Sequence, residues 1–296
     1  GEVMHSVSVG IMAYNEEGNI GKLLEASLLQ DFKHGILKEI VVVASGCTDH
    51  TEDIVRNYMK KDSRVRLLTQ AKREGKASAI NYYLSQACGD IYILESGDTI
   101  PQEETYERLV APFTDARVGM TGARPVPVNS KANFIGFVVH MMWNLHHKIA
   151  LSSPKLGELV AFRCIVREIP RDSAVDEASI EAIIREAGLE LRYCPDAIVR
   201  NKGPENVKDF LKQRRRIAAG HKHLAHEKGY VVSTTDPMRI LKILLQEHTW
   251  KLKDTLWTLG GIGLEVIGRV LGYYDYYIKK KNPFIWDIAV TTKKWD

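Results

Sequence analysis

The chain has 296 residues, of which 45% are hydrophobic and 26% are charged, and its formal net charge at pH 7 is +4. This length allows one large or two modest domains, and the composition is that of an ordinary folded protein. The mild charge argues against a dedicated nucleic-acid binder, so no nucleic-acid partner is expected. The four cysteines are widely separated and lack C-x-x-C spacing, which favours reduced thiols over a zinc knuckle or a disulfide framework. With no charged-then-apolar segment at its start, the chain is expected to be cytoplasmic.

The first hundred residues alternate between apolar β-rich runs and amphipathic helical patterns. Strands are predicted at residues 6–13, 39–44, 65–69 and 90–94, and helices at 20–29, 51–59 and 77–88. The loops that follow the strands carry the polar residues. This alternation is typical of an α/β protein with a doubly wound, mostly parallel sheet and flanking helices.

The second half is less regular. Strands are predicted at 119–128, 158–166 and 190–199, and helices at 134–151, 176–187 and 207–227. The strand at 119–128 contains prolines, which favours an edge position. A shift in composition near Pro237 places the boundary between a catalytic domain, 1–233, and a C-terminal helical region, 234–296.

The C-terminal region has an apolar face at helical spacing between Thr255 and Ile278. Because this stretch contains Glu265, Arg269 and Asp275, and a spanning helix needs about 20 largely uncharged residues, we do not expect it to cross a membrane. Tyrosines followed by a lysine run suggest an amphipathic helix on a membrane surface. The alternative is a helix docked on the core of a soluble protein. The spacing of Glu265 and Arg269 predicts an ion pair.

The stretch 92–101 ends a predicted buried strand and places Glu95 and Asp98 near its carboxyl end. In open α/β sheets this end of a strand is where ligands bind. A hard cation meeting a diphosphate is one interpretation. A solvated aspartate in a turn is the other.

Six short motifs, in order, resemble those of family 2 glycosyltransferases with the glycosyltransferase-A fold, over about residues 7–223. They are Ala13-Tyr14-Asn15-Glu16-Glu17, Ser45-Gly46-Cys47-Thr48-Asp49-His50-Thr51, Gly75-Lys76-Ala77-Ser78-Ala79-Ile80-Asn81, Ser96-Gly97-Asp98-Thr99-Ile100-Pro101, Asp176-Glu177 and Gln213-Arg214-Arg215-Arg216-Ile217. The resemblance implies an inverting sugar transfer from a nucleotide-sugar donor.

The motifs depart from the family pattern at several positions. Ser96 stands where the family has the first Asp of D-x-D, which leaves Asp98 as the expected metal ligand. Glu95 comes one residue too early and on an alternating strand points away, so it is at most a helper. Ser45 replaces the Asp that binds the nucleobase, which leaves both UDP- and GDP-sugars open. The acid pair reads D-E, and Ile217 replaces a Trp, which argues against a processive synthase.

The resemblance implies a role for each remaining site residue. Asp98 would hold Mn²⁺ or Mg²⁺ against the leaving diphosphate, and Glu177, with Asp176 beside it, would accept the proton of the acceptor hydroxyl. The residues expected to bind the donor are Ala13, Tyr14, Asn15, Glu16, Ser45, Arg73, Lys76, Ser96, Gln213 and Arg216. The helix at 134–151 is a candidate acceptor-binding element, and Glu158 a candidate to border the same cleft.

Simpler alternatives remain for each role. Asn15 and Glu16 would otherwise cap the next helix, the acid pair would complement a helix dipole, and Lys76 would be a solvated loop residue. The leading hypothesis is a metal-dependent hexosyltransferase, peripheral to the cytoplasmic membrane face, with a lipid or lipid-linked acceptor. The alternatives are a soluble transferase acting on a small molecule or polysaccharide, and a non-catalytic nucleotide-sugar-binding protein.

Overall fold

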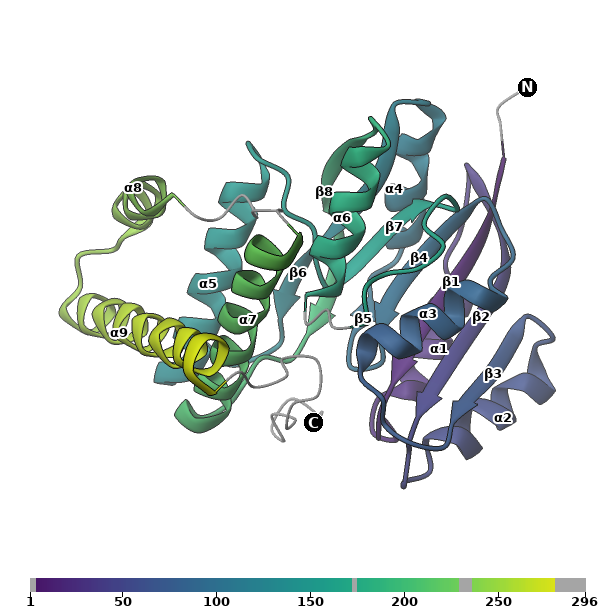
Figure 1. The fold of residues 1–296 in the computed structure, drawn as a ribbon, viewed down its shortest axis with the longest axis horizontal. Coiled ribbons are helices and arrows are strands. Elements are labelled where there is room, and N and C mark those ends of the chain that lie inside the picture. Colours follow the sequence, from purple (N-terminus) through teal and green to yellow (C-terminus); the bar gives the residue numbers. More distant parts are fainter. Residues whose placement is uncertain (1–3, 172–174, 229–235, 280–296) are drawn as a thin grey trace.

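The computed structural model describes residues 4–171, 175–228 and 236–279 (Figure 1). Its first part contains β1 (His5–Ala13), α1 (Ile20–Leu28), β2 (Gly35–Ser45), α2 (Thr51–Lys61), β3 (Val65–Gln70), α3 (Lys76–Gln86), β4 (Ile91–Ser96), β5 (Ile100–Pro101), α4 (Thr105–Val110) and a 3-10 turn, η1 (Ala111–Thr114). It continues with β6 (Val118–Pro127), α5 (Phe134–Ala150), β7 (Leu159–Arg163), α6 (Asp176–Glu186), β8 (Glu190–Asn201), α7 (Val207–Lys228), α8 (Pro237–Glu247), α9 (Leu252–Tyr274) and a π-helical turn, η2 (Asp275–Lys279).

The described strands form one sheet of eight, in the order β3-β2-β1-β4-β7-β6-β8-β5. Strands β1 to β4 pair in parallel, whereas β7 runs antiparallel to both β4 and β6. The apolar runs predicted as β1, β2 and β4 are almost completely buried, as expected for parallel strands covered on both faces. The prediction of a mostly parallel α/β sheet with flanking helices is confirmed.

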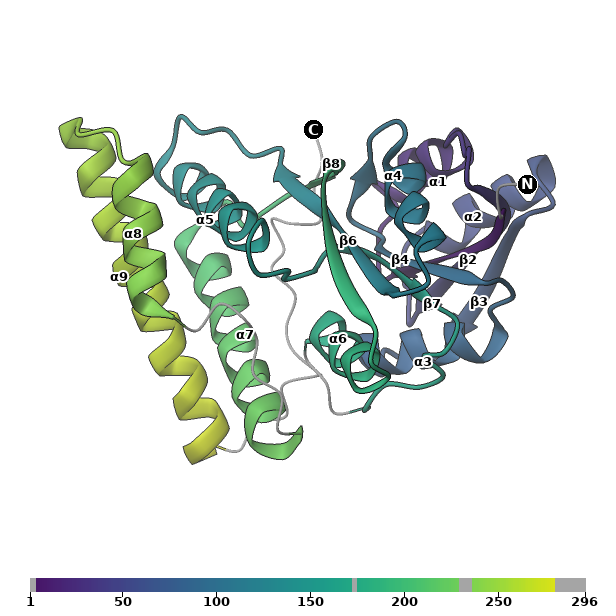
Figure 2. The ribbon, with the colours of Figure 1, turned by 90° about the horizontal axis from the view of Figure 1, so that it is seen from above.

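Helices cover both faces of the sheet (Figure 2). Helices α1, α2 and α4 pack on one face through a core that includes Leu23, Val55 and Tyr106. On the other face α3 and α6 contribute Tyr83 and Ile180 to a second core. The carboxyl ends of β1, β2 and β4 therefore open between these two layers, where the first four motifs lie.

The prediction of an edge strand at 119–128 is wrong, because β6 lies between β7 and β8. Its pairing with β7 covers Met120–Gly122. Pro125 and Pro127 lie beyond that segment, where β6 pairs with β8. The prolines thus occupy the part of the strand in which a missing N–H donor costs no bond to β7.

The C-terminal helices form a separate layer beside α5 and α7, at the end of the molecule far from α2 and β3 (Figures 1 and 2). Helix α9 packs on α5 and α7 through three buried glycines, Gly261, Gly268 and Gly272. Arg269 donates to Glu265 at 3.0 Å, as the spacing predicts. The predicted domain boundary at 233/234, and Lys280 and Lys281 of the lysine run, lie outside the described residues.

Within the described chain, no helix combines the length and the apolar character needed to span a bilayer.

Candidate active site

The loop after β1 is fastened to the loop after β2 by Asn15. Its backbone is left-handed, with φ of 49°, a conformation that Asn tolerates better than most residues. The Asn15 amide donates to Thr48 Oγ1 at 3.2 Å, and its oxygen accepts from the Thr48 N–H at 2.8 Å. The Glu16 N–H donates to Thr51 Oγ1 at 2.8 Å. Asn15 therefore ties two strand ends together instead of capping α1 with its side chain.

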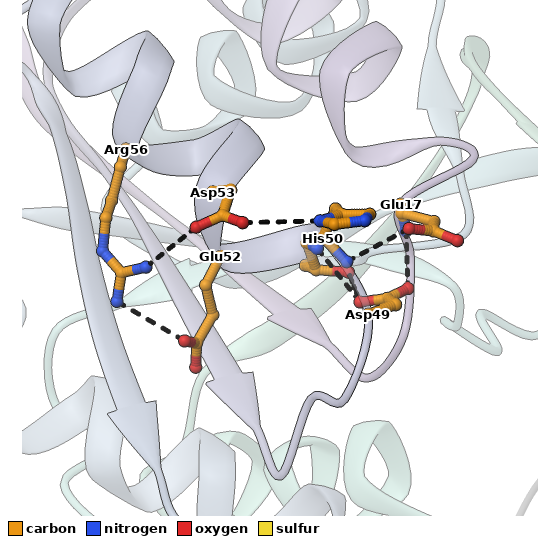
Figure 3. Close-up of polar contacts among 7 residues, drawn as sticks. Glu17, Asp49, His50, Glu52, Asp53 and Arg56 are labelled. Atoms are coloured by element: carbon orange, nitrogen blue, oxygen red, sulfur yellow. Dashed lines mark hydrogen bonds and ion pairs between the residues drawn. The ribbon is translucent and has the colours of Figure 1, made fainter.

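Asp49 strengthens the same junction (Figure 3). Its carboxylate accepts from the N–H and hydroxyl of Thr51 and from the N–H of Glu17. Burial raises the pKa of Asp49, but these donors outweigh burial and keep the pKa below its ordinary value. The Glu17 carboxylate in turn accepts from the His50 N–H at 3.1 Å. The two loops form one cross-linked unit beside the predicted nucleoside pocket.

The loop after β3 approaches this unit closely. Gly46 has φ of +59°, and a side chain there would lie 2.6 Å from the Arg73 nitrogen, so only Gly fits without strain. The Arg73 guanidinium lies 4.7 Å from the centre of the Tyr14 ring, a cation–π distance. Ser45, the last residue of β2, donates its hydroxyl to Gln70. Arg73 therefore lies next to Gly46 and Tyr14, in the loops that follow β2 and β1.

Lys76 connects the end of β4 with the start of α6. Its ammonium lies 3.3 Å from Ser96 Oγ and 3.2 Å from Glu177 Oε1. Burial lowers the pKa of Lys76, but the carboxylates of Glu177, Asp176 and Glu158 outweigh burial and raise it well above its ordinary value. Lys76 therefore carries its charge at any physiological pH. It is the first residue of α3, and its side chain is 38% exposed and paired with Glu177.

Asp176 and Glu177 begin α6 and have different environments. Asp176 is 3% exposed, and its Oδ1 has no hydrogen-bond partner among the described residues. Burial raises the pKa of Asp176 to about 7, although Lys76 opposes this. The side chain of Glu177 is 24% exposed. Burial raises its pKa as well, but the Lys76 ammonium outweighs burial and leaves the Glu177 pKa below its ordinary value. Glu177 is therefore ionised at neutral pH.

Helix α7 directs three consecutive arginines in three directions. Arg214 pairs with Glu265 of α9, and Arg215 pairs with Asp275 of η2. Arg216 faces the site instead, where burial lowers its pKa and the carboxylates of Asp176, Glu177 and Asp98 oppose that shift. Gln213 lies three residues before Arg216, a spacing that puts both on one face of the helix.

Glu95 points away from the Lys76 cluster, as strand alternation predicts. It is 1% exposed and accepts hydrogen bonds from the hydroxyls of Tyr106 at 2.5 Å and Thr99 at 2.7 Å. Burial raises the pKa of Glu95 to about 7, partly offset by these two donors. Its oxygens are occupied by α4 and the following turn, so Glu95 does not replace the missing Asp at position 96.

Nine of the thirteen predicted site residues fall into two groups, which leave out Asp98, Arg73, Gln213 and Arg216. Ser96, Lys76, Asp176 and Glu177 line one small pocket together with Glu158 and with Glu95, whose carboxylate accepts from Tyr106 and Thr99. The remaining donor-binding candidates from the first and second motifs, Ala13, Tyr14, Asn15, Glu16 and Ser45, lie at the ends of β1 and β2. Sequence reasoning gave Glu158 only a bordering role, because nothing in Leu156-Gly157-Glu158-Leu159 signals that its carboxyl shares a pocket with Lys76.

A family model described as glycosyl transferase family 2 matches residues 8–171, more than half of the chain. The chain belongs to this family. Glycosyltransferase AglE of Haloferax volcanii is 31% identical over 116 residues, 39% of this chain and 38% of the relative. The dolichyl-phosphate β-glucosyltransferase ALG5C of Trichomonas vaginalis is 24% identical over 178 residues, 54% of this chain and 52% of the relative. The chain therefore matches about two fifths to half of these relatives' lengths.

Two solved structures share the fold of this chain. A mannosyltransferase of Pyrobaculum calidifontis, PcManGT, solved with GDP-Man and Mn²⁺, superposes with a TM-score of 0.66 at 20% identity, covering 92% of this chain and 88% of that one. The glucosyl-3-phosphoglycerate synthase of Mycobacterium tuberculosis, solved with Mn²⁺, UDP and phosphoglyceric acid, gives 0.54 at 19% identity, covering 77% and 80%. The predicted glycosyltransferase-A fold is confirmed.

Proposed function

We propose that this chain is an inverting, metal-dependent hexosyltransferase that moves a sugar from a UDP- or GDP-sugar to a lipid or lipid-linked acceptor at the cytoplasmic membrane face. The observation that carries the catalytic part is the contact of the Lys76 ammonium with both Ser96 and Glu177. It puts a permanently protonated ammonium between the end of β4, where we expect the diphosphate, and an ionised carboxylate suited to be the base.

The reaction we propose is a single displacement. The acceptor hydroxyl oxygen bonds to the anomeric carbon while the bond from that carbon to the diphosphate oxygen breaks. The proton of the hydroxyl passes to Glu177, whose side chain is the more exposed of the acid pair. The nucleoside diphosphate leaves with the negative charge, which Lys76, Arg73 and Arg216 are suited to stabilise.

The donor itself would activate the base. Without donor, Lys76 is engaged with Glu177 and keeps the pKa of that carboxyl low, which makes Glu177 a weak base. A diphosphate next to Lys76 competes for the ammonium. Once Lys76 turns toward the phosphates, burial raises the Glu177 pKa toward the range in which a carboxylate accepts a proton efficiently.

A divalent cation fits the end of β4. Among the described residues no group of three His, Cys, Asp or Glu side chains is suited to hold a metal on its own. Asp98 is the candidate ligand, because its carboxylate oxygens suit a hard cation and its charge acts on both Glu158 and Arg216 of the site. Bound Mn²⁺ or Mg²⁺ would neutralise the diphosphate, whose oxygens would complete its coordination. The two solved structures described above contain Mn²⁺.

The membrane part of the proposal is supported by the outer faces of α8 and α9. Large apolar side chains on these helices are exposed: Met238 72%, Leu241 46%, Leu245 52%, Leu256 57%, Leu259 61%, Val266 55% and Val270 60%. No residue of α8 is buried. Exposed apolar faces of this extent mark interaction surfaces. A bilayer interface suits them, because Lys242 and Lys253 lie on the same helices and Lys279 on the turn that follows α9.

Donor hydrolysis and sugar transfer test the catalytic part. Turnover of UDP- and GDP-sugars is measured with and without Mn²⁺ for the wild type, Asp98→Asn and Glu103→Gln, an exposed carboxylate nearby. We expect metal-dependent turnover that Asp98→Asn removes and Glu103→Gln retains. Donor binding without turnover in the wild type would favour a non-catalytic nucleotide-sugar-binding protein.

Co-sedimentation with phosphatidylglycerol vesicles tests the membrane part. The double variant Leu256→Glu/Leu259→Glu is expected to lose vesicle binding that the wild type shows. Leu29→Glu is the matched control, because Leu29 is 74% exposed on the catalytic domain, outside α8 and α9. Equal partitioning of all three proteins would refute a membrane role for this face and leave a soluble transferase.

A further inference from the structure

Glu158 has an unusual backbone for its residue type. Its φ is +65°, in the left-handed region that non-glycine residues other than Asn and Asp rarely adopt. Strained backbones of this kind persist where the surrounding structure imposes them, and they cluster at functional sites. Gly157, the residue before it, does not have a positive φ. The chain therefore uses glutamate at the position where glycine would be the unstrained choice.

Glu158 and Ser96 lie just beyond the end of the pairing between β4 and β7. These strands are antiparallel, and their pairing ends with Glu95 opposite Leu159, so Ser96 and Glu158 are the next residues of the two chain segments. Ser96 is the position at which the first carboxylate of the family's D-x-D motif is missing. Glu158 and Ser96 line the same pocket, so a carboxyl group is present there, supplied by the residue that precedes β7.

The charged groups around Glu158 include a second carboxylate, that of Asp98. Asp98 is the charged group that acts most strongly on Glu158. Neither carboxylate has a hydrogen bond or ion pair within the described part of the chain, and Lys76 is engaged with Glu177 and Ser96. In addition, Asp176 lines this pocket, is 3% exposed, and has its Oδ1 unpartnered among the described residues. Lys76 and Arg216 offset part of the repulsion between Glu158 and Asp98, and a cation bound between the two carboxylates would offset it further.

We propose that Glu158, the residue before β7, is the second protein carboxylate on the donor-bound divalent cation and substitutes for the Asp that Ser96 replaces on β4. This inference rests on the proposed function, whose donor diphosphate supplies further oxygen ligands. Two carboxylates, Asp98 and Glu158, together with diphosphate oxygens and water, form the all-oxygen set that Mn²⁺ and Mg²⁺ prefer.

Mn²⁺ titration followed by electron paramagnetic resonance, with GDP or UDP present, tests the proposal without relying on turnover. Glu158→Gln is expected to weaken Mn²⁺ binding by at least about tenfold, since even the loss of an outer-shell partner of a ligand costs about that much at other metal sites. Glu103→Gln should bind like the wild type. Ser96→Asp in the Glu158→Gln background returns a carboxylate to β4 and should recover most of the affinity.

Two further results separate this proposal from the proposed function. Mn²⁺ affinity that is lost in Asp98→Asn but unchanged in Glu158→Gln overturns the role of Glu158 and leaves the proposed function intact. A wild-type protein that binds no Mn²⁺ with either nucleotide overturns metal dependence and, with it, this assignment. Glu158→Gly provides a second variant, because glycine relieves the left-handed backbone; it must fold and must show the same loss of Mn²⁺ affinity.

Discussion

Replacing Glu95 with Gln should change how the stability of the protein depends on pH. Glu95 is 1% exposed, and its pKa is about 7, compared with 4.5 for an unperturbed glutamate. The folded state therefore holds the Glu95 proton more tightly than the unfolded state does. Below pH 4.5 this residue contributes its full stabilisation, and the contribution is lost as pH rises through about 7.

The size of the effect follows from the shift. At about 1.4 kcal/mol per pKa unit, the rise from 4.5 to about 7 corresponds to about 3 kcal/mol of unfolding free energy. Gln has nearly the same shape and does not titrate. Its oxygen can accept from Thr99, and the Tyr106 hydroxyl can rotate to accept from its amide. The stability of Glu95→Gln relative to the wild type should thus increase by about 3 kcal/mol between pH 4.5 and pH 8.

Urea unfolding at four pH values between 4.5 and 8 measures this difference, with Glu103→Gln as the exposed control. A difference between Glu95→Gln and the wild type that does not change with pH would refute the reasoning. The same variant should keep its Mn²⁺-dependent turnover, because the Glu95 oxygens face Tyr106 and Thr99 instead of the expected cation. Loss of Mn²⁺ binding in Glu95→Gln would show that Glu95 is a ligand.

Three further predictions concern catalysis and the C-terminal layer. Glu177→Gln should lower kcat roughly 10²- to 10⁴-fold with donor affinity retained in calorimetry, since it removes the base, and a kcat near the wild-type value would exclude that role. Gly272→Ala should lower Tm, because its new Cβ would lie 2.5 Å from the backbone oxygen of Arg215. In the control Gly263→Ala the new Cβ meets nothing within 4 Å, so this variant should stabilise α9 by about 0.8 kcal/mol. Equal changes in Tm for the two variants would contradict this. Asp275→Asn should cost about 2–3 kcal/mol in urea unfolding, since Asp275 is fully buried against Arg215, and unchanged stability would show that the pair contributes nothing net.

The first half of the fold could be predicted from sequence because its strands and helices are long and strongly patterned. The apolar runs of β1, β2 and β4 and the helical spacing of α2 leave few alternatives. Helix α4 and strand β5 are shorter than the windows over which periodicity can be recognised, so they were missed. The prediction that β6 is an edge strand was wrong because a proline shows only that one backbone N–H donor is missing. The place of a strand in the sheet depends on which strands, distant in sequence, pair with it.

The sequence indicated many of the residues of the candidate site, but it did not indicate which of them contact one another. Lys76 and Glu177 are 101 residues apart, and no spacing rule indicates that they form an ion pair. Asn15 is a residue type that adopts left-handed backbone readily, so its turn was within reach of sequence reasoning. Glu158 is not such a type, so its left-handed backbone could not be expected from the sequence. The pocket that Glu158 and Ser96 both line shows that they lie close together.

The three arginines of α7 have a consequence for how mutational data on this protein will look. Successive side chains on a helix project about 100° apart, so Arg214, Arg215 and Arg216 reach three separate surroundings. A scan across these positions should give two variants that loosen the outer helices and one that impairs turnover in a well-folded protein. Substitutions at neighbouring positions would thus affect different properties of the protein. If the three arginines were treated as one basic segment and their effects averaged, neither the loss of stability nor the loss of turnover could be assigned to its residue.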